Sequence, residues 1–209
     1  MITIVDLGIG NLYSLNRAFS YYHQDVNISN SKSEIAKSEK IVLAGVGSFK
    51  TAMKSIDEIG IKDFLIDFSK DGNFLLGICL GMQILTEYSE EGGLTEGLGI
   101  IPGKVTYLRN NKNFSSDIKV PNIGWNHINF NTENDISNSL LKRNNNFDEF
   151  YFVHSLCVHS NKENEIASSE YGDINFSSVI NQYNVTGCQF HPENSGKAGL
   201  SIIKEFISK

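Results

Sequence analysis

The chain has 209 residues, of which 40% are hydrophobic and 20% are charged, and its formal net charge is −6. This composition is sufficient for a full hydrophobic core. A net acidic chain without a basic cluster argues against nucleic-acid binding, because phosphates must be neutralised by Lys and Arg. No apolar run approaches the ~20 residues of a membrane helix, and the first residues do not form a signal peptide. Three cysteines without a Cys-x-x-Cys metal spacing favour a cytoplasmic protein with free thiols and no bound metal.

The first half of the chain alternates short apolar strands with amphipathic helices. Strands are predicted over residues 2–5, 25–28, 40–44 and 74–78. The last of these is apolar at nearly every position, as is typical of a buried parallel strand. Helices are predicted after Asn11, a suitable N-cap, and over residues 49–56, 61–69 and 82–87.

The second half is richer in strands with short connections. They are predicted over residues 103–108, 126–130, 150–158, 165–169, 177–182 and 185–189, and a closing helix is predicted over 196–208. Several of these strands are expected to be antiparallel neighbours. The sequence therefore predicts one α/β domain spanning residues 1–209, with a mostly parallel central sheet, helices on both faces and an antiparallel extension.

A cysteine stands between a predicted strand and a predicted helix, in the run Gly77-Ile78-Cys79-Leu80-Gly81-Met82-Gln83. Small residues two positions before and after a nucleophile allow the sharp turn called a nucleophile elbow. Such a turn places the thiol at the carboxyl edge of the sheet and at a helix N-terminus, which favours the thiolate. The alternative is a structural cysteine flanked by two incidental glycines.

A histidine and a carboxylate follow the last predicted strand, in the segment His191-Pro192-Glu193. In an extended chain, residues i and i+2 point to the same side, and the proline stiffens the segment between them. A thiol nucleophile needs a base, and the base needs an orienting acceptor. The sequence therefore predicts Cys79 as nucleophile, His191 as base and Glu193 as its orienting acid.

Two further features have alternative explanations. The Gly45-Val46-Gly47 turn after a predicted strand could supply a backbone N–H group to an oxyanion, as could Leu80, but a plain turn explains the glycines equally well. Cys157 lies near His154 and His159 in sequence, but strand spacing would place residues 154 and 157 on opposite faces. Cys157 and Cys188 are therefore expected to be structural.

Together these residues resemble the class I, or triad, glutamine amidotransferases, and the resemblance covers essentially the whole chain. It rests on both motifs above and on residues 6–12, 45–49, 124–126, 151–155 and 189–195. Within this family the chain is most similar to the glutaminase subunits of imidazole glycerol phosphate synthases. The resemblance implies hydrolysis of L-glutamine to glutamate and ammonia, without a cofactor. It also implies a heterodimer with a (β/α)8-barrel cyclase subunit, which would receive the ammonia in histidine biosynthesis.

The resemblance also assigns roles to individual residues. Cys79 would attack the glutamine amide, His191 would protonate the departing ammonia, and Glu193 would orient His191. The substrate-binding residues implied by the resemblance are Gly45, Val46, Gly47, Leu80, Gln83, Glu91, His154 and Ser155.

The chain departs from the family pattern at three positions. Ala44 stands where the family usually has Pro, Asn122 where it usually has His, and Asn194 where it usually has Lys. Asn122 and Asn194 are expected where the family meets its barrel partner. Two alternatives to the synthase subunit therefore stay open. One is a paralogous glutaminase that supplies ammonia to a sugar amidotransferase in surface-polysaccharide biosynthesis, and the other is a non-catalytic regulatory subunit.

Overall fold

A computed structural model describes residues 1–23, 25–131 and 139–209. One large sheet runs through the molecule in the order β2-β1-β3-β4-β14-β13-β11-β7-β5-β6. Its first five strands are parallel. They are β2 (Val26–Ser29), β1 (Ile2–Val5), β3 (Lys40–Gly45), β4 (Phe74–Cys79) and β14 (Val185–Cys188). The carboxyl ends of β3, β4 and β14 therefore meet at one edge of the sheet.

The sheet continues with antiparallel pairs through β13, β11 and β7, while β5 pairs with β7 in parallel and with β6 in antiparallel register. Outside this order, β12 pairs with β13, and β9 pairs with β12. The bounds of these strands are β13 (Ile174–Gln182), β11 (Leu156–Ser160), β7 (Gly103–Tyr107), β5 (Tyr88–Ser89), β6 (Thr95–Glu96), β12 (Glu165–Tyr171) and β9 (Asn129–Phe130). A separate antiparallel pair consists of β8 (Asn122–His127) and β10 (Glu149–His154).

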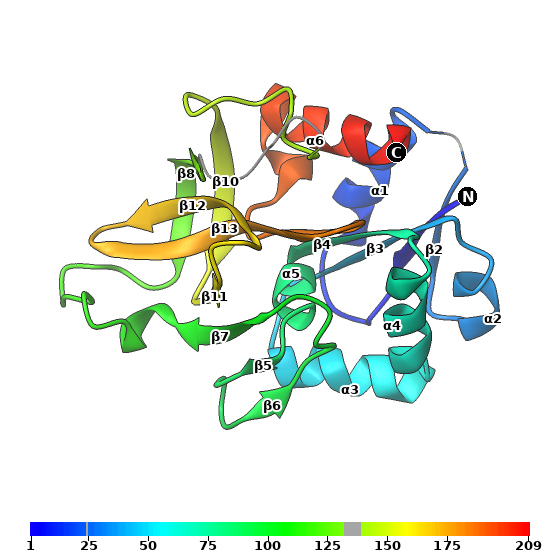
Figure 1. The fold of residues 1–209 in the computed structure, drawn as a ribbon, viewed down its shortest axis with the longest axis horizontal. Coiled ribbons are helices and arrows are strands. Elements are labelled where there is room, and N and C mark those ends of the chain that lie inside the picture. The colour runs from blue at the N-terminus through cyan, green and yellow to red at the C-terminus, as the bar shows by residue number, and fades with distance from the viewer. Residues whose placement is uncertain (24, 132–138) are drawn as a thin grey trace.

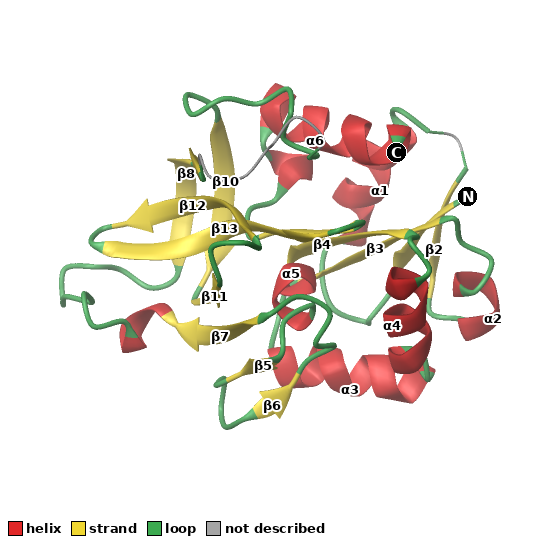
Figure 2. Cartoon of the chain, viewed as in Figure 1, coloured by secondary structure: helices red, strands yellow, loops and turns green. Residues whose placement is uncertain are grey.

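Helices cover both faces of the parallel half of the sheet (Figures 1 and 2). Helices α1 (Leu12–Ser20) and α6 (Gly196–Ser208) lie on one face. Helices α3 (Phe49–Ile59), α4 (Lys62–Lys70) and α5 (Leu80–Ile84) lie on the other. The remaining helical segments are α2 (Lys32–Ile35) and the 3-10 turns η1 (Leu108–Asn110) and η2 (Pro192–Asn194). Within the described residues, no helix has the length and apolar character needed to cross a membrane.

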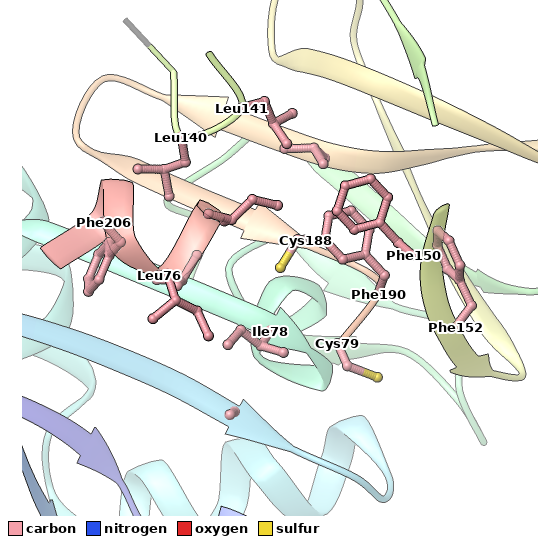
Figure 3. Close-up of a cluster of buried hydrophobic side chains, with 14 of the residues drawn as sticks. Leu76, Ile78, Cys79, Leu140, Leu141, Phe150, Phe152, Cys188, Phe190 and Phe206 are labelled. Atoms are coloured by element: carbon pink, nitrogen blue, oxygen red, sulfur yellow. The ribbon is translucent and has the colours of Figure 1, made fainter. Parts of the chain in front are cut away.

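Each helical layer packs on its own face of the sheet through buried apolar side chains. On the α1 and α6 side, Phe19 and Phe206 meet edge to face with ring centroids 6.1 Å apart. Figure 3 shows part of this cluster, including side chains from β4, β10 and α6. The Cys188 sulfur lies within it, while the Cys79 sulfur points away at its margin. The expectation that Cys188 is a core residue is therefore confirmed.

The structure confirms the predicted fold class and corrects three predicted elements. Residues 150–158 form two strands in different sheets, because the chain leaves β10 at Ser155 and enters β11. The apolar residues on both sides of His154 and Ser155 concealed this break. Residues 126–130 belong to two strands, β8 and β9, separated at Ile128. The helix predicted over 82–87 begins at Leu80, directly after Cys79, and ends at Ile84.

Candidate active site

The Cys79 backbone forms a sharp turn between β4 and α5, with φ 53° and ψ −109°. This conformation is strained for a residue with a side chain. A Cβ on Gly81 would lie 1.9 Å from the Leu43 carbonyl oxygen of β3, and a Cβ on Gly77 would lie 2.6 Å from the Gly81 oxygen. Both glycines are therefore required by backbone packing, and they are not incidental to the turn.

The segment after β3 lies beside this turn. Strands β3 and β4 are paired in register, with Gly45 opposite Cys79. Val46 and Gly47 follow, and together with Cys79 they line a cavity. The loop after β1 packs tightly against the Gly45 backbone, since a Cβ on Gly10 would lie 3.0 Å from the Gly45 Cα. The parallel register, which sequence could not supply, therefore brings the two glycine-containing turns together.

His191 and Glu193 form a buried pair at the end of β14. The distance between His191 Nδ1 and Glu193 Oε1 is 2.8 Å, and the two side chains are 9% and 7% exposed. The backbone of β10 holds this segment, because the His191 N–H donates to the Tyr151 carbonyl oxygen and the Tyr151 N–H donates to Ser195 Oγ. Residues 192–194 form the 3-10 turn η2, so the extended geometry expected from sequence is wrong, although the two side chains do lie together.

The surroundings of His191 favour its charged form. Burial by itself lowers the pKa of His191, but Cys79 and Glu193 together outweigh that effect and raise it to about 10. His191 Nε2 and Glu193 Oε2 are buried without a hydrogen-bond partner among the described residues. With Nδ1 bonded to Glu193, Nε2 is the ring atom left for proton exchange. The site can thus hold a thiolate beside an imidazolium.

The cavity beside Cys79 has a volume of about 340 Å³. Among its lining residues are seven of the eight predicted substrate-binding residues, and Gly45 is the exception. The seven are Val46, Gly47, Leu80, Gln83, Glu91, His154 and Ser155. The other residues that line it, apart from Cys79, are Tyr107, Arg109, Pro121, Val153 and Leu156.

Arg109 is a cavity residue that sequence reasoning missed. Its guanidinium lies over the Tyr107 ring, 4.9 Å from the ring centroid, at the end of β7. Glu91 also lines the cavity, and its Oε2 accepts a hydrogen bond of 2.6 Å from the Phe49 N–H at the start of α3. The cavity therefore carries one basic and one acidic side chain. No local motif marks Arg109, because only the tertiary fold brings the segment after β7 to the cavity that Cys79 lines.

His154 has both ring nitrogens bonded to protein atoms. Its Nδ1 is 2.7 Å from the Leu156 carbonyl oxygen, which can only accept, so Nδ1 carries the proton. Asn122 Nδ2 lies 3.0 Å from Nε2 and donates to it. Burial lowers the pKa of His154 to about 4, so the ring is neutral at pH 7. His154 thus forms a fixed, uncharged part of the cavity wall.

The structure places Asn122 against the buried His154 ring. Asn122 is 4% exposed. Alternation along β8 directs Asn122 inward and its neighbour Ile123 outward. Asn194, by contrast, is exposed after His191 and Glu193.

The other two cysteines are poor nucleophiles. Burial raises the pKa of Cys157 to about 12, and it raises the pKa of Cys188 as well. Cys157 Sγ lies 3.4 Å from His159 Nε2, on the same strand, and His154 belongs to the other sheet. Both thiols are therefore structural, as expected.

Comparisons with known proteins agree with this geometry. The family model for class-I glutamine amidotransferases matches residues 3–209. The imidazole glycerol phosphate synthase subunit HisH of Geobacillus thermodenitrificans is 40% identical over 99% of this chain and 95% of its own length. The subunit HisH of Methanosarcina barkeri is 42% identical over 99% of this chain and 97% of its own length. A crystal structure of a glutamine amidotransferase superposes with a TM-score of 0.73 at 16% identity, covering 99% of this chain and 97% of that one, which supports the fold.

The chain belongs to the class I glutamine amidotransferase family. Its similarity to HisH subunits confirms the subfamily that the sequence motifs indicated.

Proposed function

We propose that this chain is the glutaminase subunit of an imidazole glycerol phosphate synthase. It hydrolyses L-glutamine to glutamate and ammonia and passes the ammonia to a cyclase subunit in histidine biosynthesis. The observation that carries this proposal is the His191–Glu193 pair, 2.8 Å apart and buried at the carboxyl edge where the Cys79 elbow also lies. Full-length similarity to synthase subunits supports the pathway.

The chemistry follows from the protonation states in the site. The Cys79 thiolate attacks the side-chain amide carbon of glutamine, and the His191 imidazolium gives its Nε2 proton to the departing nitrogen as the C–N bond breaks. A water molecule then loses a proton to neutral His191 and attacks the thioester carbon. Glutamate leaves and the Cys79 sulfur returns to its starting form. Glu193 holds the ring orientation throughout and stabilises its charged form.

The cavity offers groups that match the parts of glutamine. Leu80 follows the nucleophile and starts α5, so its N–H is available to a developing oxyanion, with the turn at Gly45, Val46 and Gly47 beside it. Glu91 is the candidate partner of the α-ammonium group and Arg109 of the α-carboxylate, because their charges are opposite to those groups. Gln83, His154 and Ser155 complete the wall.

An exposed apolar strip supports a partner next to the cavity. On β8, Ile123 is 59% and Trp125 is 54% exposed. In the antiparallel register Ile123 lies opposite Val153, which lines the cavity, and Trp125 lies opposite Tyr151. Large exposed apolar side chains in one place are typical of protein interfaces. We infer that the (β/α)8-barrel cyclase covers this strip and receives ammonia from the adjoining cavity.

The cysteines indicate the cellular compartment of the protein. Three buried free thiols, with no disulfide among them, fit a reducing compartment, so we place the protein in the cytoplasm.

The two alternative functions have less support. A paralogue serving sugar amidation would share every hydrolytic residue, but the relatives are named as synthase subunits. A non-catalytic subunit would have no need for the strained Cys79 turn and the buried His191–Glu193 pair, because unneeded strain and buried charge both destabilise a fold.

The test separates ammonia production from ammonia use. In a complex with the barrel cyclase, Cys79→Ala should lower glutamine-dependent synthesis by roughly 10³-fold or more, because nucleophilic attack is lost. Synthesis from added ammonium salt should stay near the wild-type rate. Cys157→Ala, which removes a buried thiol outside the site, is the control and should retain both activities. Equal loss of both activities in Cys79→Ala would contradict the proposed role.

A further inference from the structure

Gln189 is a fully buried polar residue next to the nucleophile. Its side chain is 0% exposed, and its Nε2 lies 3.6 Å from Cys79 Sγ. It follows β14 directly and precedes His191 by two positions. Gln189 takes no part in the proposed proton transfers. A buried amide nevertheless requires hydrogen-bond partners to offset the loss of water.

A chain of hydrogen bonds fixes which end of the Gln189 amide faces the sulfur. Gln83 Nε2 lies 3.3 Å from the Leu156 carbonyl oxygen. That oxygen can only accept, so this end of the Gln83 amide must be the NH2 group. The second hydrogen on the same nitrogen faces Gln189 at 3.1 Å, where the acceptor must be Oε1. The Gln189 NH2 group is thereby directed at Cys79 Sγ.

We propose that Gln189 is a positioning residue for the nucleophile: its side-chain NH2 group, oriented by Gln83 and the Leu156 carbonyl, donates a hydrogen bond to Cys79 Sγ and holds the thiolate at the cavity. This inference rests on the proposed function, because it concerns the same nucleophile. Gln189 gains and loses no proton. The Cys79 proton passes to His191 Nε2, and the amide stabilises the charge that remains on sulfur.

A carbonyl oxygen near the sulfur explains why the Gln189 donor matters after Cys79 has lost its proton. The Val153 carbonyl oxygen lies 3.8 Å from Cys79 Sγ and can accept a hydrogen bond from the neutral thiol only. Once the proton has left, that oxygen repels the thiolate, whereas the Gln189 donor is attracted more strongly. In the thiol, the sulfur therefore has a donor in Gln189 and an acceptor in Val153. In the thiolate, the Gln189 NH2 group and the His191 imidazolium are the groups that attract it.

The reactivity of Cys79 toward iodoacetamide tests this inference directly. Gln189→Met keeps the length of the side chain and removes both donors. Gln189→Leu removes both donors with a shorter, branched apolar side chain that carries no titratable group. We expect both variants to lower the alkylation rate of Cys79 at pH 7 by about tenfold, the range for a lost hydrogen bond to a charged group. The pH profile of alkylation should move to higher pH.

The readout is specific to the nucleophile. Cys157 and Cys188 are buried, and burial raises the pKa of each, so they react slowly, and mass spectrometry of peptides assigns the modified thiol. The titratable or charged groups around the sulfur come from three places. They are His191 and Glu193 after β14, Cys188 on β14, and Tyr107, His154, Glu91 and Arg109 around the cavity. None of them is altered in the two variants.

Ser178→Ala is the matched control. Ser178 is buried beside Gln189, and its carbonyl oxygen accepts the Gln189 N–H at 2.9 Å, a bond that alanine retains. Its hydroxyl has no hydrogen-bond partner among the described residues, so alkylation should match wild type. With glutamine, the Gln189 variants should lose kcat and keep KM within about twofold, because the thiolate is not a ground-state binding group.

The outcomes distinguish this inference from the proposed function. Slower alkylation in both folded Gln189 variants, with Ser178→Ala unchanged, supports the positioning role. Unchanged alkylation in either folded variant overturns it, even if glutaminase activity is normal in wild type. Alkylation requires no glutamine turnover, so failure of the glutaminase assay in wild type would overturn only the proposed function. Thermal melting of each variant confirms that the measured protein is folded.

Discussion

At the scale of single residues, two buried histidines near Cys79 have opposite properties. His191 contacts a carboxylate and a thiol that favour its charged form, so its pKa is raised to about 10. His154 contacts a carbonyl oxygen and an amide, neither of which offsets the loss of water around a charge, so burial lowers its pKa to about 4. The first can therefore deliver a proton, whereas the second cannot hold one at pH 7.

The shift at His154 predicts a specific loss of stability in acid. Its folded pKa of about 4 lies below the ordinary 6.5, so the unfolded chain binds the proton more tightly. The contribution of the neutral ring is present above pH 6.5 and is lost as the pH falls toward 4, by up to about 3 kcal/mol. We expect the free energy of unfolding of His154→Gln, measured with urea, to be lower at pH 7 and to fall less between pH 6.5 and 4.

The control for this prediction is a histidine outside the cavity. The His127 side chain is 53% exposed on β8, so His127→Gln should keep the wild-type slope of stability against pH. A wild-type slope in His154→Gln would contradict the assigned contribution.

At the scale of elements, the site depends on two adjacent parallel strands. Strands β4 and β14 pair in register from Leu75 and Val185 to Ile78 and Cys188, so the residues that follow them meet at the same edge. Cys79 ends one strand, and Gln189 and His191 follow the other. The second sheet then fixes the base, because the backbone of β10 binds the segment from His191 to Ser195.

The outward face of β8 predicts where the partner binds. Trp125 packs edge to face on Tyr151, with ring centroids 6.0 Å apart, and remains more than half exposed. Exposed aromatic residues of this kind contribute strongly to interfaces. We expect Trp125→Ala to raise the Kd for the barrel cyclase by roughly tenfold or more, measured by titration calorimetry.

A matched aromatic residue lies elsewhere on the surface. Tyr183 is 90% exposed in the turn between β13 and β14, at the opposite end of β14 from His191. Tyr183→Ala should bind the cyclase with wild-type affinity. An equal effect of both substitutions would place the interface elsewhere.

At the scale of the whole molecule, the reaction site is buried on one side and open on the other. Helices and sheet cover the His191–Glu193 pair, while the cavity wall includes Val46, which is 47% exposed, and adjoins the strip of Ile123 and Trp125. Water can therefore compete for the donors that face the substrate. A partner over the strip would exclude this water and keep ammonia from being protonated in solvent.

This arrangement predicts that the isolated chain is a slow glutaminase. Addition of the barrel cyclase with its ligand should accelerate ammonia release by roughly five- to 150-fold, the usual range for coupling between two sites. The measurement is the initial rate of glutamate formation with and without the partner. An isolated chain as fast as the complex would contradict the coupling.

Much of the fold and the triad candidates could be read from local patterns. Apolar periodicity located most of the strands and helices of the first half within a few residues, because each pattern reflects burial of one face. The nucleophile motif was readable because its two glycines are needed by the turn itself and by its close packing on β3. Patterns were less informative over residues 150–158, where strand-forming apolar residues stand on both sides of His154 and Ser155, so that periodicity did not mark the change of sheet.

The sequence by itself determined the chemical types in the site: a thiol on a sharp turn, an imidazole with a carboxylate two residues later, and the family that combines them. The tertiary structure decided which distant groups complete it. Tertiary packing brought Arg109, which follows β7, and Val153, which lies on the separate β8–β10 sheet, to the cavity. Alternation on β8 turned Asn122 inward, and a chain of acceptors and donors from Leu156 directed Gln189 at the sulfur. The physical reason is that local sequence restricts backbone shape and side-chain chemistry, whereas hydrogen-bond direction and burial depend on neighbours that are remote in the chain.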